Sequence, residues 1–199
     1  MKKLFLVGLL LSALVAGAKG RVTVKIAEGS ENPEIESLLG LLDASQAVAT
    51  IVADSIDAPL YAVWMVNYSG DEPTRKLAGY VPVQPDSTRI FIAAMAKDSL
   101  TVQINIRNSS RQRVSIPTAS HSLIGCGGER TYNNVDTIPL MAYTTGIPTK
   151  RRLADGNEVE AFYFCGIRDT KEHPSRWKKL YNLPEFLYFE AIPVKQFGL

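Results

Sequence analysis

The sequence predicts a mainly β protein: an antiparallel β-sandwich of about seven to nine short strands, with one N-terminal helix and, as an option, a short C-terminal helix. Two observations predict this fold class. Short segments rich in β-branched and aromatic residues recur along the chain, and turn residues separate them. These segments do not alternate with long helical segments, so the pattern does not favour a parallel sheet.

A secretory signal peptide is predicted in front of this domain. The chain starts with Met1 and two lysines, continues with an apolar run from Leu4 to Val15, and then has small residues up to Ala18. A membrane-spanning helix would need about 20 apolar residues, and Lys19 ends the run earlier. We therefore expect cleavage after Ala18 and export to the periplasm, the cell surface or the medium.

Residues 19–199 are expected to form a single domain, because 46% of the chain is hydrophobic, which is enough to build a core. The sequence has 22 Lys and Arg against 20 Asp and Glu, and loss of the two signal-peptide lysines makes these numbers equal. A nucleic-acid-binding protein normally has a basic excess, so no nucleic-acid partner is expected. Acidic residues gather between Glu28 and Glu36, and basic ones between Arg107 and Arg113, which indicates internal charge complementarity or a polar contact face.

The predicted elements begin with a strand and a helix. Residues 21–27 alternate strictly between apolar and polar side chains, as in a half-buried strand. Capping residues and Pro33 then precede apolar residues at helical spacing, so a helix is expected from about Pro33 to Ala44. Two interpretations are open after it: the helix continues toward Val52, or residues 47–53 form a strand.

From residue 60 onward, strands dominate the prediction. Residues 100–107 alternate most cleanly and are expected to form a hairpin with residues 89–96. Pro193 indicates an edge strand or a strand end, because proline cannot donate a backbone hydrogen bond. The other expected strands are residues 60–68, 114–116, 122–124, 138–144, 159–167 and 186–194.

The two cysteines of an exported chain are expected to form a disulfide, here between Cys126 and Cys165. Cys126 lies in a glycine-rich bend, and Cys165 lies in the predicted strand 159–167. Closing this loop would stabilise the fold by about 4 kcal/mol on the chain-entropy estimate. The alternative is two free, buried thiols.

No catalytic residue is predicted, and the sequence leans away from an enzyme. Cys126 with His121 or His173 as its base is the sharpest catalytic hypothesis, but no third group orients the base, and a bonded sulfur cannot attack. No cysteine pair has zinc-site spacing, and Asp169, Glu172 and His173 lack a regular ligand spacing, so no metal is expected. No cofactor-binding motif is present either.

The segment from residue 168 to 181 mixes basic and aromatic side chains and is the candidate binding region. Such a mixture could contact an anionic membrane surface or an acidic glycan; the alternative is a short helix whose aromatic residues pack inward. The candidate residues are Arg168, Lys171, Arg176, Trp177, Lys178, Lys179 and Tyr181. Two glycosylation sequons begin at Asn67 and Asn108.

The leading hypothesis is an exported, non-enzymatic β-sandwich that binds an unknown macromolecule or glycan. One alternative is a self-assembling subunit whose strand 21–27 adds to the sheet of a neighbouring copy. Another is a membrane-active protein that inserts the amphipathic segment 35–52 into a bilayer.

Overall fold

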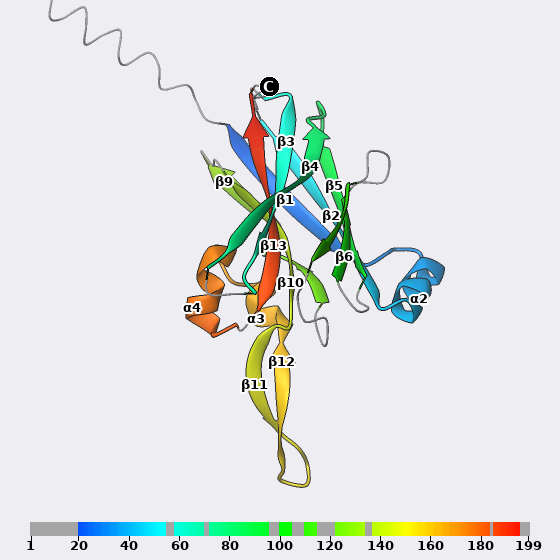
Figure 1. The fold of residues 1–199 in the computed structure, drawn as a ribbon, viewed down its shortest axis with the longest axis vertical. Helices are drawn as coiled ribbons and strands as arrows, with labels where there is room; N and C mark the ends of the chain where they lie inside the picture. The colour runs from blue at the N-terminus through cyan, green and yellow to red at the C-terminus, as the bar shows by residue number, and fades with distance from the viewer. Residues whose placement is uncertain are drawn as a thin grey trace, which may run out of the picture.

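The computed structural model describes residues 20–54, 58–69, 72–95, 100–104, 110–114, 122–133, 137–183 and 185–195. Thirteen strands occur in these residues, and most of them form two antiparallel sheets that pack face to face (Figure 1). The predicted β-sandwich is therefore confirmed, with more strands than expected. The predicted signal peptide lies outside the described residues and stays a prediction.

The first sheet has six strands in the order β7-β6-β5-β2-β1-β9. Strand β1 is paired on both sides, with β2 along most of its length and with β9 at its start. An assembly that used residues 21–27 to extend the sheet of another copy would have to exchange these pairings, and this role for β1 stays a prediction. The bounds are β1 Arg21–Glu28, β2 Ala44–Ala53, β5 Thr88–Met95, β6 Leu100–Ile104, β7 Ser110–Val114 and β9 Arg130–Asn133.

The second sheet has five strands in the order β4-β3-β13-β10-β8, so the C-terminal strand β13 lies at its centre. A register shift at residues 139–142 of β10 and another at residues 63–64 of β3 curve this sheet. Pro193 pairs at the far end of β13, opposite Tyr61, which agrees with its expected place at a strand end. The bounds are β3 Leu60–Asn67, β4 Thr74–Pro82, β8 Ser122–Gly125, β10 Ile138–Thr144 and β13 Phe186–Val194.

The main hydrophobic core lies between the two sheets. Alternate residues of each strand point into it, because side chains change face at every step along a strand. The largest fully buried side chains of this core are Ile51, Tyr61, Ile90, Ile92, Ile138, Leu140, Met141 and Phe189. A second cluster occupies the outer face of the second sheet and includes Phe186 and Trp177.

Helix α2, Pro33–Leu41, connects β1 to β2 and is shorter than predicted. Leu42 and Asp43 end it, and Asp43 has a left-handed φ of 48°. The chain then enters β2, so the strand interpretation of residues 47–53 is correct. Segment 35–52 is therefore not one amphipathic helix, and inserting it into a membrane would remove a central strand from the first sheet.

Strands β11, Ile147–Arg152, and β12, Glu158–Tyr163, form a separate two-stranded sheet that projects from the sandwich (Figure 1). Three short helices follow: α3 Phe164–Arg168, η2 Pro174–Arg176 and α4 Trp177–Tyr181. The predicted strand 159–167 is therefore wrong beyond Tyr163, since Cys165 lies on α3. In the part of the chain that the structure describes, no helix is both long and apolar enough to cross a bilayer.

Candidate functional site

The hairpin of residues 147–163, which we call the arm, is the most exposed part of the described chain. Every side chain from Pro148 to Glu160 is exposed, and the arm extends away from both sheets (Figure 1). Its turn is well ordered by local bonds: the Gly156 amide donates to Leu153 O at 3.0 Å, and the Asn157 amide donates to Asp155 Oδ1 at 2.9 Å. An isolated two-stranded hairpin is only marginally stable in water, so a contact that covers the arm would stabilise it.

The two faces of the arm differ in chemistry. Directly paired residues of an antiparallel hairpin share a face. One face pairs Lys150 with Glu160 and Arg152 with Glu158, and is therefore lined with opposite charges. Pro148 and Phe162 form the third pair on this charged face. The other face, which we call the apolar face of the arm, carries a single cation. Its cross-strand pairs are Ile147 with Tyr163, Thr149 with Ala161, and Arg151 with Val159.

The base of the arm is fixed to the body by two glycines. Gly146 has a left-handed φ of 83°, which favours glycine, and it leads the chain from β10 into β11. Gly166 lies on α3, where an added Cβ would lie 2.7 Å from the Tyr163 ring. The close approach of Tyr163 to the backbone of Gly166 sets the direction in which the arm leaves the sandwich.

Helix α2 is the second exposed apolar element. Asn32 caps it, since Asn32 Oδ1 accepts hydrogen bonds from the amides of Glu34 at 2.9 Å and Ile35 at 3.3 Å. None of its nine residues is buried. A short helix usually owes its stability to packing of an apolar face, and α2 has little such packing on its own molecule.

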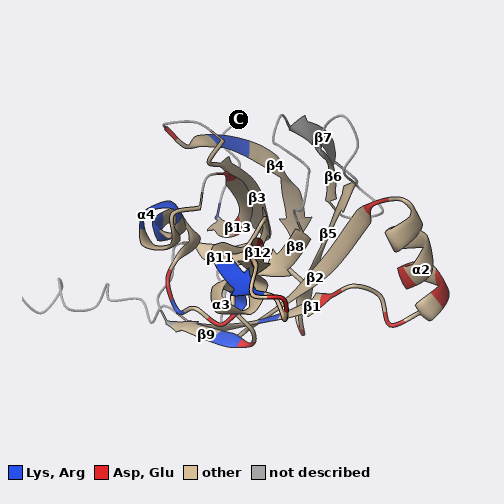
Figure 2. Cartoon of the chain, turned by 90° about the horizontal axis from the view of Figure 1, so that it is seen from below, with Lys and Arg blue, Asp and Glu red and all other residues tan. Residues whose placement is uncertain are grey.

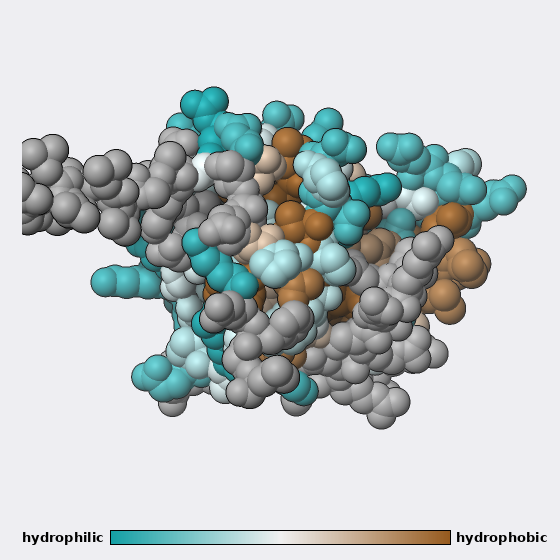
Figure 3. Space-filling model, turned by 90° about the horizontal axis from the view of Figure 1, so that it is seen from above, coloured by the Kyte–Doolittle hydropathy of each residue, from teal (hydrophilic) through white to brown (hydrophobic). Residues whose placement is uncertain are grey.

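Glu34, Leu38 and Leu41 form an outward stripe on α2, because they follow one another at i, i+4 and i+7. The exposed fraction is 54% for Leu38 and 84% for Leu41. Figure 3 shows hydrophobic side chains gathered on α2 next to hydrophilic ones. A leucine that is exposed to this extent on an ordered helix indicates a contact surface.

Exposed apolar side chains concentrate on these two elements. Among the described residues, eleven large hydrophobic side chains are exposed, and eight of them lie on the arm or on α2 and the residue after it. These eight are Ile35, Leu38, Leu41, Leu42, Leu153, Val159, Phe162 and Tyr163. Exposed hydrophobic residues scattered singly need no explanation, but two clusters on projecting elements indicate binding.

The two elements also differ in charge. From residue 28 to residue 43 the chain contains five acidic residues and no basic one. Strand β11 contains Lys150, Arg151 and Arg152 and no acidic residue. Figure 2 shows the acidic residues on α2 and the basic residues on β11. The acidic charge of α2 therefore lies beside its exposed leucines. On the apolar face of the arm the only charge is Arg151, because Lys150 and Arg152 lie on the other face with Glu158 and Glu160 of β12.

The structure buries Trp177 of the predicted binding segment 168–181 and half-buries Tyr181. Trp177 is fully buried, and its indole Nε1 donates to Glu172 O at 3.1 Å. The Tyr181 hydroxyl lies 2.5 Å from Thr170 Oγ1, and its ring packs against the second cluster. The mixed aromatic and basic surface is therefore not formed, because α4 buries its aromatic side.

The basic residues of this segment are divided among different contacts. Arg168 pairs with Glu28 at 3.1 Å, and Arg176 pairs with Glu172 at 2.6 Å. Glu28 also accepts a hydrogen bond from the Gly125 amide at 2.8 Å, so Arg168 helps to hold β8 to β1. Lys171 and Lys179 are exposed, and Lys178 is half-buried.

The predicted disulfide is absent from the structure, because Cys126 and Cys165 are both free. Cys126 is buried in the second cluster together with Ile167. Cys165 lies two positions before Ile167 on α3, which is about 200° around a helix, so its thiol faces solvent on the opposite side. Burial raises the pKa of the Cys126 thiol, which disfavours the thiolate that a nucleophile requires.

A buried charged cluster on the outer face of the second sheet was not foreseen from the sequence. Arg75 Nη2 lies 2.6 Å from Glu190 Oε1, and the guanidinium lies 4.4 Å from the centroid of the Trp64 ring. The Glu190 side chain is only 6% exposed. Desolvation, together with the nearby charge of Glu190, raises the pKa of Tyr188. The signal that could have located this cluster is an acidic residue within the apolar strand β13.

The structure forms no site at some of the other predicted features, and the rest lie outside the described residues. No group of three or more His, Cys, Asp or Glu side chains that could hold a metal ion is found among the described residues. His121 and the sequon at Asn108 lie outside them. Asn67, the first residue of the other sequon, is half-buried, and its Oδ1 accepts a hydrogen bond from the Ser69 amide at 3.0 Å.

Comparison with known proteins adds no assignment: no family model, no curated protein and no solved structure matches this chain.

Proposed function

We propose that this chain is an exported, self-associating binding module in which the arm of one copy packs against α2 of the next. The observation that carries the proposal is the concentration of exposed hydrophobic side chains on these two elements. Both elements are ordered although they bury little on their own molecule, and the one charged side chain on the apolar face of the arm, Arg151, is opposite in sign to the acidic α2. A second copy of the chain supplies both complementary surfaces, so it is the partner that we favour.

The dimensions of the two surfaces agree with this contact. The stripe from Glu34 to Leu41 covers about 10 Å at the rise of an α-helix. On the apolar face of the arm, the distance from Arg151 to the level of Tyr163 is four strand residues, or about 13 Å. Glu34 can therefore approach Arg151 while Leu38 packs at the level of Ala161 and Leu41 at the level of Tyr163.

This contact would be heterologous, because the arm and α2 are different surfaces of the same chain. Contacts of this kind produce closed rings when the rotation between copies closes, and open filaments when it does not. The proposal therefore predicts an assembly of two or more copies that forms as the protein is concentrated.

The test is sedimentation velocity of residues 19–199 over a wide range of concentration. Leu41→Ser should weaken association by about tenfold, because it removes the most exposed leucine of the stripe. Arg151→Gln should weaken it by about two- to fivefold, the contribution of an exposed ion pair. Lys150→Gln is the matched control, since Lys150 lies on the other face of the same strand.

A charge exchange separates this geometry from a general effect of charge. Glu34→Arg and Arg151→Glu should each reduce association when made alone, and the double variant should recover it. A monomer at every concentration would contradict the proposal, as would equal effects of Arg151→Gln and Lys150→Gln.

A further inference from the structure

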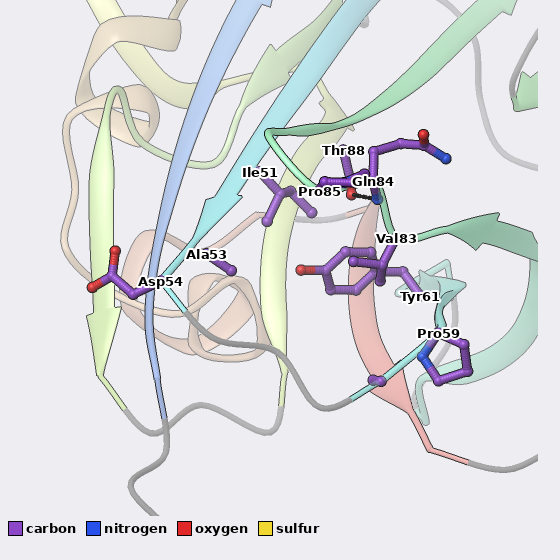
Figure 4. Close-up of a pocket in the computed structure, with 10 residues that line it drawn as sticks. Ile51, Ala53, Asp54, Pro59, Tyr61, Val83, Gln84, Pro85 and Thr88 are labelled. Carbon is purple, nitrogen blue, oxygen red and sulfur yellow. Dashed lines mark hydrogen bonds between the residues drawn. The ribbon is translucent and has the colours of Figure 1, made fainter.

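A cavity of about 350 Å³ lies at the end of the sandwich away from the arm. The end of β2, the start of β3 and the turn between β4 and β5 form its walls (Figure 4). This volume is within the range of small-molecule sites in proteins. Six of its ten lining residues are apolar, namely Ile51, Ala53, Ala58, Pro59, Val83 and Pro85, and the other four are Asp54, Tyr61, Gln84 and Thr88.

Tyr61 places its hydroxyl inside this cavity. The residue is 1% exposed, and its hydroxyl points toward Ile51 and Ala53 (Figure 4). No hydrogen bond from this hydroxyl to another described residue is found. Thr88 differs, because its Oγ1 already accepts a hydrogen bond from the Gln84 amide at 3.0 Å. The Tyr61 hydroxyl is therefore a donor that is open to the cavity, and an acceptor on a ligand placed there would receive its hydrogen bond.

The charge of the cavity limits the class of ligand. Burial raises the pKa of Tyr61 to about 12, so the phenol stays neutral and can donate a hydrogen bond at physiological pH. Asp54 and Gln84 are the other polar residues at the rim, and Figure 4 shows both side chains directed away from Tyr61. None of the described residues that line the cavity is basic, so none of them could balance an anion.

We propose that this cavity binds a small, uncharged, mainly apolar molecule through one hydrogen-bond acceptor that receives the Tyr61 hydroxyl proton. The apolar walls hold the body of the ligand, and Tyr61 selects the acceptor. Binding of an anion is disfavoured, because an anion that entered the cavity would lose its hydration without gaining a cationic partner.

Three probes of similar size test this selectivity: acetophenone, which has an acceptor; ethylbenzene, which has none; and benzoate, which is an anion. Binding to ¹⁵N-labelled residues 19–199 is followed by the NMR shifts of the Ala53, Val83 and Thr88 amides. Acetophenone should bind about three- to tenfold more tightly than ethylbenzene, the effect of one hydrogen bond. Benzoate should bind more weakly than either.

Two variants and one control connect the result to this cavity. Tyr61→Phe should abolish the preference for acetophenone without lowering the stability of the protein, because the hydroxyl it removes has no described partner. Ala53→Leu should weaken binding of both probes by filling the cavity. Tyr143→Phe is the control: Tyr143 is a buried tyrosine of the same core that does not line the cavity.

The proposal is overturned if acetophenone shifts none of the three amides, or if its preference over ethylbenzene survives in Tyr61→Phe. These outcomes are independent of self-association, because the arm and the cavity lie at opposite ends of the molecule (Figure 1). Tyr61→Phe should leave the sedimentation behaviour unchanged.

Discussion

At the scale of single residues, His173 couples the stability of the C-terminal helices to pH. Its Nδ1 accepts a hydrogen bond from the Ser175 amide at 3.2 Å and thereby caps η2, which requires that this nitrogen carry no proton. Desolvation lowers the pKa of His173 below 6.5, and the charge of Glu190 opposes this shift only in part. The unfolded chain therefore binds the proton more readily than the folded one.

The free energy of unfolding should consequently decline as the pH falls from about 7.5 to about 5, where the carboxylates are still ionised. Urea unfolding at a series of pH values measures this slope. His173→Asn should remove it, since asparagine also caps a helix but does not titrate. The chain has one other histidine, so His121→Asn is the control and should retain the slope. An unchanged slope in His173→Asn would show that another group is responsible.

The burial and the contacts of single side chains were the features least predictable from the sequence. Basic residues precede and follow Trp177 in the sequence. This pattern is equally typical of an exposed binding surface and of a short helix that buries one side. The burial of Trp177 depends on Phe186, which comes later in the chain and lies 5.9 Å away between ring centroids. Cys165 has a free thiol because the chain forms one helical turn after Tyr163, and no local sequence pattern predicted this turn.

At the scale of elements, Arg75 ties the edge strand β4 to the central strand β13 through Glu190. Arg75→Met keeps an apolar stem over Trp64 but leaves a buried carboxylate without its cation. We expect the free energy of unfolding at neutral pH to fall by about 2 kcal/mol, less than for a fully buried pair because Arg75 is partly exposed.

Chemical denaturation measures this loss. The double variant Arg75→Met with Glu190→Gln should recover most of it, because the buried charge is then gone. Arg89→Met, at an exposed position on β5, is the matched control and should have little effect. If Arg75→Met and Arg89→Met changed stability equally, the ion pair would contribute nothing.

Elements with regular alternation were predictable, and those shaped by tertiary contacts were not. Strands β1 and β6 were predicted from alternation, and both are strands in the structure, where they belong to the first sheet. Strand β11 was missed because Pro148 and three consecutive basic residues resemble a loop. Such residues are tolerated there because β11 is an edge strand with its side chains in solvent. Part of the binding surface that we propose therefore lies on β11, a segment whose sequence resembles a loop.

At the scale of the whole molecule, the body and the arm should be separable. Every side chain from residue 148 to residue 160 is exposed, so the arm contributes nothing to either hydrophobic cluster beyond its base. Replacing residues 150–160 with Asn-Gly keeps the pair Thr149 and Ala161 next to a two-residue turn of the type that closes hairpins. It also removes equal numbers of basic and acidic residues, so the net charge does not change.

The shortened protein should unfold cooperatively and within a few degrees of the full-length chain, because the body retains its core. It should also be monomeric at concentrations where the full chain associates, because the apolar face of the arm has lost Arg151 and Val159. Differential scanning calorimetry and sedimentation velocity measure the two properties on the same sample. If the melting temperature fell sharply, the arm would be part of the folding unit; if association persisted, the contact between copies would lie elsewhere.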